Sequence, residues 1–326
     1  MDTFAPVDDC WFLTGPTASG KTALSLELAE RLGAEILSLD SMAVYRRMEI
    51  GTAKPDTATR ACVAHHLIDL VEPTEDFSIS QYLEHAHRAV DDIRSRGREA
   101  LFVGGTPLYL KALLRGLADG PPGDPELRAQ LESEAEQQGS AELHARLAEV
   151  DPEAARRVHP HDTRRIVRAL EVFAKTGQPM SDYQQHFAQG RAAKDCRVFV
   201  LDWPRDVLHQ RINARVETMF VEGLVEEVRG LLADYGRLGT TAAQAVGYRE
   251  VIQYLDGARA PHSRRSATAD LSPPVDLPQT IELTKARTRQ FARRQLIWFR
   301  GLSECRWIGM SDQTNVAELA ARIAAE

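Results

Sequence analysis

Cysteine is scarce in this chain, and long apolar runs are missing. The four cysteines, Cys10, Cys62, Cys196 and Cys305, lie far apart and form no C-x-x-C pair. This spacing indicates neither a zinc site nor a disulfide framework, and it fits a reducing compartment, which we expect to be the cytoplasm. No apolar run approaches the roughly 18–20 residues that span a bilayer, so we expect no membrane segment.

Excess positive charge is also missing. The formal net charge is −7, and the first nine residues are acidic without the basic-then-apolar layout of a signal sequence. This charge argues against indiscriminate nucleic-acid binding but permits a local basic patch. With 326 residues, of which 43% are hydrophobic, the chain can bury a large core. We expect one main domain with an insertion.

The most informative segment is Gly15–Thr22, which has the phosphate-binding loop pattern G-x-x-x-x-G-K-[ST]. Trp11–Thr14 is predicted as a strand before it, and Ala23–Leu32 as an amphipathic helix that ends at Gly33. Such a loop directs backbone N–H groups at phosphate oxygens, where the helix dipole also favours negative charge. We therefore expect a bound diphosphate or polyphosphate; the alternative is a chance Gly/Ser-rich turn.

Strands and helices alternate along the first third of the chain. Further predicted strands are Glu35–Leu39, Ala100–Val103 and Arg197–Leu201, with a helix over Leu108–Arg115. The alternation predicts an α/β fold of the P-loop NTPase type, a parallel sheet with helices on both faces. Ligands of such sheets bind at the carboxyl ends of strands, where Gly15–Thr22, Asp40 and Thr106 all fall. We expect the active site there.

The composition changes between Gly116 and Lys194. Asp119–Asp124 is a Gly/Pro break, and helical periodicity dominates from Pro125 onward. We predict an all-helical insertion domain over residues 119–194, with residues 1–118 and 195–326 forming the P-loop core domain. The insertion contains the basic run Arg164–Arg168, which fits either a solvated helix face or a phosphate-contacting patch.

The last predicted helix is strongly basic. Before it, Arg205–Tyr235 is predicted to be helical and Gly257–Pro278 to be a polar loop. The helix has Lys285, Arg287, Arg289, Arg293, Arg294 and Arg300 with no acidic residue among them, interleaved with Phe291, Trp298 and Phe299. This mixture suits a nucleic-acid backbone and unstacked bases. The alternative is an amphipathic helix whose aromatics pack inward while its arginines pair with the core domain.

A P-loop alone does not distinguish kinases, NTPases and enzymes that hold a diphosphate leaving group. A switch NTPase normally has a second strand-end carboxylate, but Ala100–Val103 ends in Gly-Gly-Thr. Asp40 suits a general base, or a carboxylate that orders Mg²⁺ or caps a helix. Thr106 suits a phosphate contact or a plain tight turn. Lys21 would add a positive charge, and Thr22 would offer its hydroxyl to Mg²⁺.

At these positions the chain resembles the tRNA dimethylallyltransferases, also called tRNA isopentenyltransferases. The matching segments, in family order, are Gly15–Thr22, Asp40-Ser41, Tyr45, Gly51–Pro55, His66–Asp69, Gly104–Thr106, Leu108-Tyr109, Ala214–Phe220, Val246–Glu250, Arg293–Gln295 and Trp298–Arg300. They cover nearly the whole chain. The sequence shows no zinc-finger extension of the eukaryotic kind, so the resemblance is to the bacterial form.

The resemblance implies a prenyl transfer. Dimethylallyl diphosphate would donate its five-carbon group to N6 of the adenosine 3′-adjacent to the anticodon in tRNA, releasing pyrophosphate. The loop with Lys21, Mg²⁺ on Thr22, and Arg215 would stabilise the departing pyrophosphate, and Asp40 would take the N6 proton. The base would be flipped into a channel. The implied partners are tRNA and dimethylallyl diphosphate, and a single RNA channel suits a monomer.

Roles follow residue by residue from the same resemblance. The catalytic residues would be Asp40, Lys21, Thr106 and Arg215. The diphosphate would be held by Gly15, Pro16, Thr17, Ala18, Ser19, Gly20, Lys21 and Thr22, with Thr22 also on the metal. Contacts to tRNA would come from Asp40, Ser41, Met42, Ala43, Thr106, Arg128, Arg164, Arg165, Ile166, Val167, Arg168, Gln244, Ala245, Val246, Gly247, Tyr248 and Arg249.

Two departures from the family pattern and three rival functions remain. Ala43 replaces the Gln or Leu of many members, and the Gly257–Pro278 stretch is longer than usual. One rival prenylates free AMP or ADP, but it has no use for the insertion domain or the basic last helix. A small-molecule kinase would use Asp40 as its base and Arg215 as a lid residue. A non-catalytic RNA-binding protein would not explain Asp40 and Thr106 together at strand ends.

Overall fold

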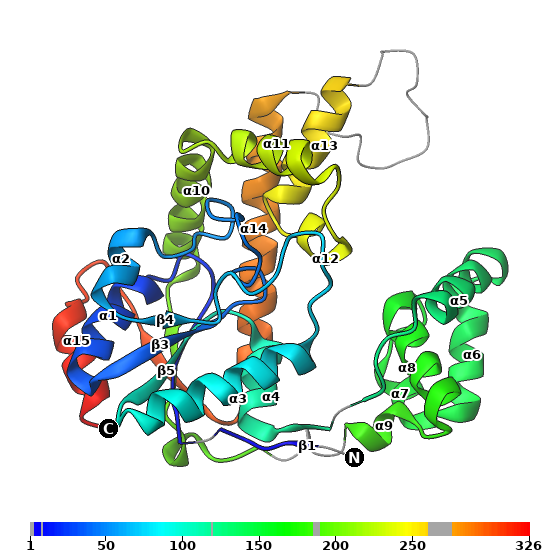
Figure 1. Ribbon diagram of the computed structural model, residues 1–326, viewed down its shortest axis with the longest axis horizontal. Coiled ribbons are helices and arrows are strands. Elements are labelled where there is room, and N and C mark those ends of the chain that lie inside the picture. The colour runs from blue at the N-terminus through cyan, green and yellow to red at the C-terminus, as the bar shows by residue number, and fades with distance from the viewer. Residues whose placement is uncertain (1–2, 8, 119, 185–189, 260–275) are drawn as a thin grey trace. The chain divides into compact units, whose positions relative to one another are not determined.

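The computed structural model describes residues 3–7, 9–118, 120–184, 190–259 and 276–326, which divide into two compact units (Figure 1). The sheet unit comprises Val7–Leu110 and Arg191–Glu326, and the helical unit comprises Met1–Pro6 and Lys111–Gly190. The longer segment of the helical unit therefore begins at Lys111, before the Gly/Pro break at which the sequence places the insertion.

A six-stranded parallel sheet forms the centre of the sheet unit, with strand order β4-β3-β5-β2-β7-β8. Its strands are β2 (Trp11–Thr14), β3 (Ala34–Leu39), β4 (His65–His66), β5 (Glu99–Gly104), β7 (Val198–Asp202) and β8 (Cys305–Gly309). Thr14 and Leu39 both pair with Gly104, so β2, β3 and β5 end at the same level. The P-loop, Asp40 and Thr106 follow these three strand ends, which confirms the expected parallel arrangement.

Burial on both faces explains the apolar strands. Every residue of β2 and β3 is buried, as expected for parallel strands covered by helices on both sides. Trp11 and Leu13 pack in one core with α1 (Lys21–Leu32) and α15 (Val316–Ala324), which lie side by side in Figure 1. On the other face, Tyr82 of α3 (Ile79–Ser95) donates a hydrogen bond to the Ser38 carbonyl at 2.9 Å.

The remaining elements of the sheet unit surround the ends of the strands. They are α2 (Thr57–Cys62), the first residues of α4 (Pro107–Arg115), a 3₁₀ turn (Ala193–Asp195), α10 (Arg205–Val221), α11 (Leu224–Tyr235), α12 (Thr240–Ala243), α13 (Tyr248–Arg259) and α14 (Leu277–Arg300). A second core of this unit joins Tyr45, Val44 and Met48 to buried residues of α11 and α13. None of the helices in the part of the chain that the structure describes is long and apolar enough to cross a membrane.

Two sequence predictions about these helices need correction. The helix expected over Arg205–Tyr235 is interrupted at Gly223, which has a left-handed φ of 103° and begins α11. The loop expected over Gly257–Pro278 is shorter at both ends, since α13 continues to Arg259 and α14 begins at Leu277. The rest of that expected loop lies outside the described residues. Pro278 is accepted because it lies in the first turn, where its missing N–H costs no helical bond.

Five helices lie wholly within the described residues of the helical unit, which also contains the Lys111–Arg115 end of α4. They are α5 (Pro125–Gln138), α6 (Ser140–Val150), α7 (Pro152–Arg157), α8 (Thr163–Thr176) and α9 (Met180–Tyr183). Their apolar faces meet around Leu131, Leu147 and Ile166. A two-stranded antiparallel ribbon, β1 (Thr3–Phe4) with β6 (Leu117–Ala118), completes the unit.

Candidate active site

The phosphate-binding loop joins β2 to α1 in a strained backbone conformation. Gly20 adopts the left-handed region at φ 88°, and Ala18 does so at φ 62° although it has a side chain. Strain of this kind usually persists only where the surrounding structure enforces it, and it is common at ligand sites. The first turn of α1 has no capping side chain and no acidic residue. Its N–H groups are therefore available to an anion.

Side chains from far along the chain hold this loop in place. Trp203 donates its indole N–H to the Ser19 carbonyl at 2.9 Å, and Arg211 donates to the Ala18 carbonyl at 2.9 Å. The Arg211 guanidinium also lies over the Trp203 ring, 4.3 Å from its centroid. Neither residue was predicted from the sequence. The only signals of a role at the loop were that Trp203 directly follows β7 and that Arg211 lies on α10.

Lys21 lies against its own loop. Its Nζ donates to the carbonyl oxygens of Gly15 at 3.0 Å and Pro16 at 2.7 Å. Burial lowers the pKa of Lys21 to about 7, the positive charge of Arg215 adds to this, and Asp40 opposes it. An anion bound beside such a lysine would raise its pKa, because the anion stabilises the charged form of the side chain.

Asp40 is half-buried directly after β3, and its carboxylate is oriented by its own turn. Oδ1 accepts hydrogen bonds from the backbone N–H groups of Met42 at 2.8 Å and Ala43 at 3.3 Å. Within the described chain, no group donates to Oδ2. An oriented carboxylate with one uncommitted oxygen can accept a proton from a substrate nitrogen.

Thr106 joins the ends of β3 and β5. Its backbone N–H donates to the Leu39 carbonyl at 3.1 Å, and its Oγ1 accepts from the Ser41 N–H at 3.0 Å. The preceding Gly104 is required sterically, because a Cβ there would lie 2.1 Å from the Leu39 oxygen. The turn therefore fixes the Asp40-Ser41 backbone against β5.

Arg215 reaches the same place from α10. Burial lowers the pKa of its guanidinium, and the negative charge of Asp40 opposes this. The charges of Arg215 and Asp40 both shift the pKa of Lys21, so the three side chains are close enough to interact electrostatically and share one electrostatic environment. The structure thus brings Lys21, Asp40 and Arg215 together, and hydrogen bonds to Ser41 and Leu39 place Thr106 beside Asp40.

The oxygen donors of this site suit Mg²⁺. Thr22 is exposed at the start of α1, and its hydroxyl, like the carboxylate of Asp40, is a ligand of the hard type that Mg²⁺ prefers. No group of three or more His, Cys, Asp or Glu able to hold a metal occurs among the described residues. Thr22 and Asp40 would therefore be the protein groups available to hold such an ion.

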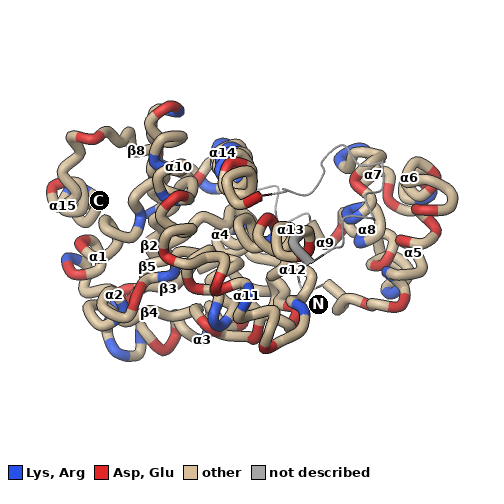
Figure 2. The backbone as a smooth tube through the Cα atoms, turned by 90° about the horizontal axis from the view of Figure 1, so that it is seen from above, with Lys and Arg blue, Asp and Glu red and all other residues tan. Residues whose placement is uncertain are grey.

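Basic side chains gather on α7 and α8 of the helical unit, whereas acidic ones dominate α5 and α6 (Figure 2). Arg164 and Arg165 are exposed on α8, but Ile166 and Val167 are buried in the helical core. The side chains of those two residues are therefore inaccessible to a ligand in this structure, whereas those of the two arginines are accessible.

Arg128 and Arg168, also expected to contact tRNA, converge on Glu171. The Glu171 carboxylate is fully buried and pairs with Arg128 at 2.9 Å and with Arg168 at 2.5 Å. It also accepts from the Asp124 backbone N–H at 2.6 Å, while Arg168 donates to the Pro121 carbonyl at 2.9 Å. These contacts anchor the Gly/Pro break to α8. Glu171 was not predicted from the sequence.

The segment Gln244–Arg249 is only partly accessible. Gln244 is exposed, but Tyr248 is fully buried and donates its hydroxyl to Glu227 at 2.5 Å. Glu227 in turn accepts from the backbone N–H groups of Glu49 and Ile50. Through Glu227, Tyr248 therefore supports the 49–51 turn, and its side chain is not accessible at the protein surface in this structure.

The basic helix α14 combines both expected arrangements. Lys285 pairs with Glu217 of α10 at 2.6 Å, and Phe299 is fully buried. Phe291 and Trp298 are 36% and 41% exposed, and Arg293 is exposed as well. The start of α14 is thus fastened to the sheet unit, while its later part presents arginine and aromatic side chains to solvent.

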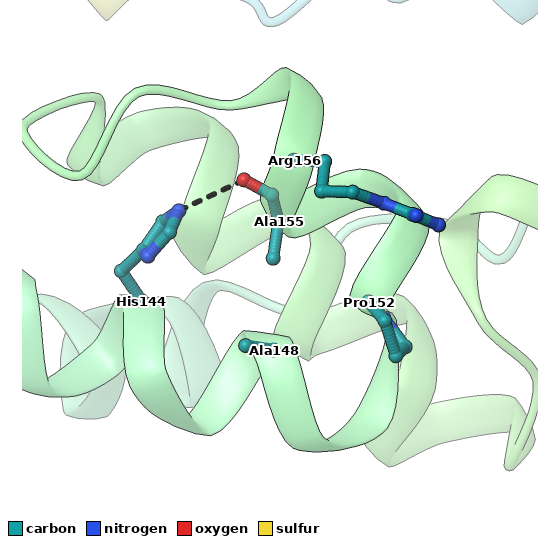
Figure 3. Close-up of a pocket in the computed structure, with 5 residues that line it drawn as sticks. All are labelled: His144, Ala148, Pro152, Ala155 and Arg156. Carbon is teal, nitrogen blue, oxygen red and sulfur yellow. Dashed lines mark hydrogen bonds between the residues drawn. The ribbon is translucent and has the colours of Figure 1, made fainter.

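The helical unit also contains a shallow, mainly apolar pocket. It is lined by His144, Ala148, Pro152, Ala155 and Arg156 (Figure 3). His144 Nε2 lies 3.0 Å from the Ala155 carbonyl oxygen, which fixes the ring at the rim. None of the predicted site residues lines this pocket.

Comparison with known families decides the identity of this arrangement. The IPP transferase family model matches residues 43–302, and the isopentenyl transferase model matches residues 9–65. The chain belongs to the IPP transferase family. Within that family it is 46% identical over 325 residues to the tRNA dimethylallyltransferase of Rhodopirellula baltica, covering 97% of this chain and 92% of the relative. It is 46% identical over 294 residues to that of Geobacter metallireducens, covering 90% of each.

Solved IPP transferases share the fold. The full-length tRNA isopentenylpyrophosphate transferase of Bacillus halodurans superposes with a TM-score of 0.64 at 36% identity, covering 98% of this chain and 96% of that one. A eukaryotic dimethylallyltransferase acting on tRNA superposes with a TM-score of 0.74 at 26% identity, covering 95% and 77%. These similarities confirm the P-loop NTPase-like α/β fold and the family resemblance seen in the sequence.

Proposed function

We propose that this protein transfers a dimethylallyl group from dimethylallyl diphosphate to N6 of the adenosine 3′-adjacent to the anticodon in tRNA. The observation that supports this most directly is the shared electrostatic environment of Lys21, Arg215 and Asp40. Two cations at a phosphate-binding loop suit the diphosphate of a donor. A carboxylate beside them suits the proton acceptor for a nucleophile.

The reaction requires one bond to form and one to break. N6 attacks C1 of the dimethylallyl group, the C1–O bond to the diphosphate breaks, and the N6 proton passes to Asp40. Lys21 and Arg215 stabilise negative charge on the pyrophosphate as it leaves. Mg²⁺, bound through Thr22 and the diphosphate oxygens, would neutralise a further part of that charge.

Acceptor binding is assigned to the basic surfaces. The exposed arginines of α8 and of the later part of α14 suit phosphates, and exposed Phe291 and Trp298 suit unstacked bases. Thr106 would position the flipped adenosine, because its hydroxyl already orients the Asp40-Ser41 turn. We further propose that the protein acts as a monomer.

The test is a transfer assay with labelled dimethylallyl diphosphate and Mg²⁺. Three acceptors are offered in parallel: an unmodified tRNA with adenosine 3′ of the anticodon, free AMP, and the same tRNA with that adenosine replaced by guanosine. A fourth reaction contains ATP and small-molecule acceptors. Label on the first tRNA alone is the expected result. Label on AMP would replace the proposal with a nucleotide prenyltransferase, and release of phosphate from ATP without prenyl transfer would indicate a kinase.

A further inference from the structure

Gln295 joins the phosphate loop to the turn that follows β5. It lies on α14 and is only 4% exposed. Its Oε1 accepts a hydrogen bond from the backbone N–H of Thr17 at 3.0 Å, and its Nε2 donates to the carbonyl oxygen of Gly105 at 2.6 Å. One amide therefore satisfies a donor on the loop and an acceptor on the turn.

Both partners of Gln295 adjoin groups assigned to the reaction. Thr17 belongs to the loop that would hold the donor diphosphate, and Gly105 immediately precedes Thr106. The Thr106 hydroxyl accepts from Ser41, the neighbour of the proposed base. The Gln295 amide thus connects the donor loop by hydrogen bonds to Gly105, and the Gly105–Thr106 peptide bond leads on to the residue that orients the acceptor side.

The Gln295 amide is tightly packed, and few other side chains could make both of its hydrogen bonds. A Cβ on Gly105 would lie 2.5 Å from Gln295 Nε2 and 3.1 Å from the Gly15 carbonyl oxygen. Glutamate would present an acceptor to the Gly105 carbonyl, and methionine would leave both backbone groups without a partner. Only a side chain with one donor and one acceptor at this reach satisfies both.

We propose that Gln295 is a positioning residue for the transfer reaction. It fixes the phosphate loop relative to the Thr106 turn and so sets the separation between the donor carbon and the acceptor nitrogen. This inference rests on the proposed function. Gln295 acts through Thr17 and Thr106 and contacts no reacting group itself. Displacing bound reactants by about 1 Å can slow a reaction about 100-fold, so the effect of losing it should be large.

The test compares Gln295→Met and Gln295→Glu with Gln290→Met, an exposed position on the same helix. Transfer to tRNA is measured under single-turnover conditions, per folded molecule, together with tRNA affinity. We expect both Gln295 variants to transfer about 10–100-fold more slowly while tRNA affinity stays within about threefold of the wild type. Gln290→Met should transfer at the wild-type rate.

A second comparison separates positioning from plain structural support. If Gln295 acts through Thr106, the Gln295→Met effect should shrink in a Thr106→Ala background, because the effects of coupled residues are not additive. A lower Tm with an unchanged transfer rate per folded molecule, or full additivity with Thr106→Ala, would overturn the inference. Absence of any transfer by the wild type would overturn the proposed function and this inference with it.

Discussion

The positive charge of Arg215 on α10 reaches Lys21 at the start of α1. Burial of the Lys21 side chain and the positive charge of Arg215 together lower the pKa of Lys21 to about 7, and burial is the larger of these two causes. Two cations that disfavour each other in this way are stabilised by an anion between them. The proposed diphosphate site can therefore be tested through the proton that Lys21 would take up when the donor binds.

Donor binding should take up a proton at pH 8. The free protein holds Lys21 mostly neutral above pH 7, and a bound diphosphate raises its pKa, so the affinity should fall with rising pH by up to about tenfold per unit. Calorimetric titration of dimethylallyl diphosphate in two buffers of different ionisation enthalpy measures this uptake. Lys21→Arg, which stays protonated, should bind without it. Equal uptake in both proteins would remove Lys21 as the source.

Replacing the proposed base should stop transfer without weakening donor binding. Asp40→Asn keeps an oxygen for the Met42 and Ala43 N–H groups but cannot accept the N6 proton, so kcat should fall about 10²–10⁴-fold. A matched control is Asp56→Asn, because Asp56 also accepts a backbone N–H, from Thr59, but only caps α2. Full turnover by Asp40→Asn would show that another group takes the proton.

The arginines of α8 should account for part of the salt dependence of tRNA binding. For each phosphate of single-stranded RNA that an arginine no longer neutralises, the slope of log affinity against log salt should fall by about 0.7. Arg164→Glu with Arg165→Glu should therefore flatten the slope by about 1.4 and weaken binding, as measured by filter binding between low and high salt. Arg88→Glu, an exposed site on α3, serves as control. An unchanged slope would make the α8 arginines a solvated face.

Glu171 is buried, but it should affect tRNA affinity indirectly, through the two arginines with which it pairs. Glu171→Gln weakens its bonds to Arg128 and Arg168, at a cost of about 1–3 kcal/mol, and both arginines should then bind tRNA less well. Burial raises the pKa of Glu171, but its hydrogen bonds with Asp124, Arg128 and Arg168 lower the pKa by more than burial raises it. The net result is a pKa below the ordinary value of 4.5. Its stabilising effect is therefore present above pH 4.5 and lost as pH falls through the folded-state pKa.

Thermal unfolding of the full chain between about pH 3 and pH 7 checks this sign. The wild type should lose stability on acidification more steeply than Glu171→Gln, whose amide does not titrate. The variant should also bind tRNA roughly tenfold more weakly at neutral pH. Wild-type affinity in the variant would mean that Arg128 and Arg168 keep their positions without the carboxylate.

Local patterns predicted the centre of the sheet well. The apolar runs before Gly15, Asp40 and Gly104 became β2, β3 and β5 within one or two residues, because buried parallel strands are apolar along their whole length. The edge strand β8 was not predicted, since it leaves Trp307 37% exposed and so has no continuous buried run. The helix α15 had a readable signal in Asn315, which caps it.

The hydrogen bonds that organise the site were less accessible to prediction. The sequence places Gln295 in the last predicted helix but cannot say which groups it meets, because its partners lie elsewhere in the chain. The same holds for Glu171, a charged residue within an apolar pattern. The burial of Ile166, Val167 and Tyr248 was equally inaccessible to prediction, since a motif match does not reveal which of its side chains point inward.

The hydrogen bond between Thr17 and Gln295 also bears on how the protein is made. The two residues are 278 positions apart in the chain. At about 5–20 residues per second, a ribosome takes roughly 15–60 s to travel from one to the other. Throughout that interval the nascent P-loop exists without the Gln295 amide, so the loop reaches its final geometry only after residue 295 has been synthesised.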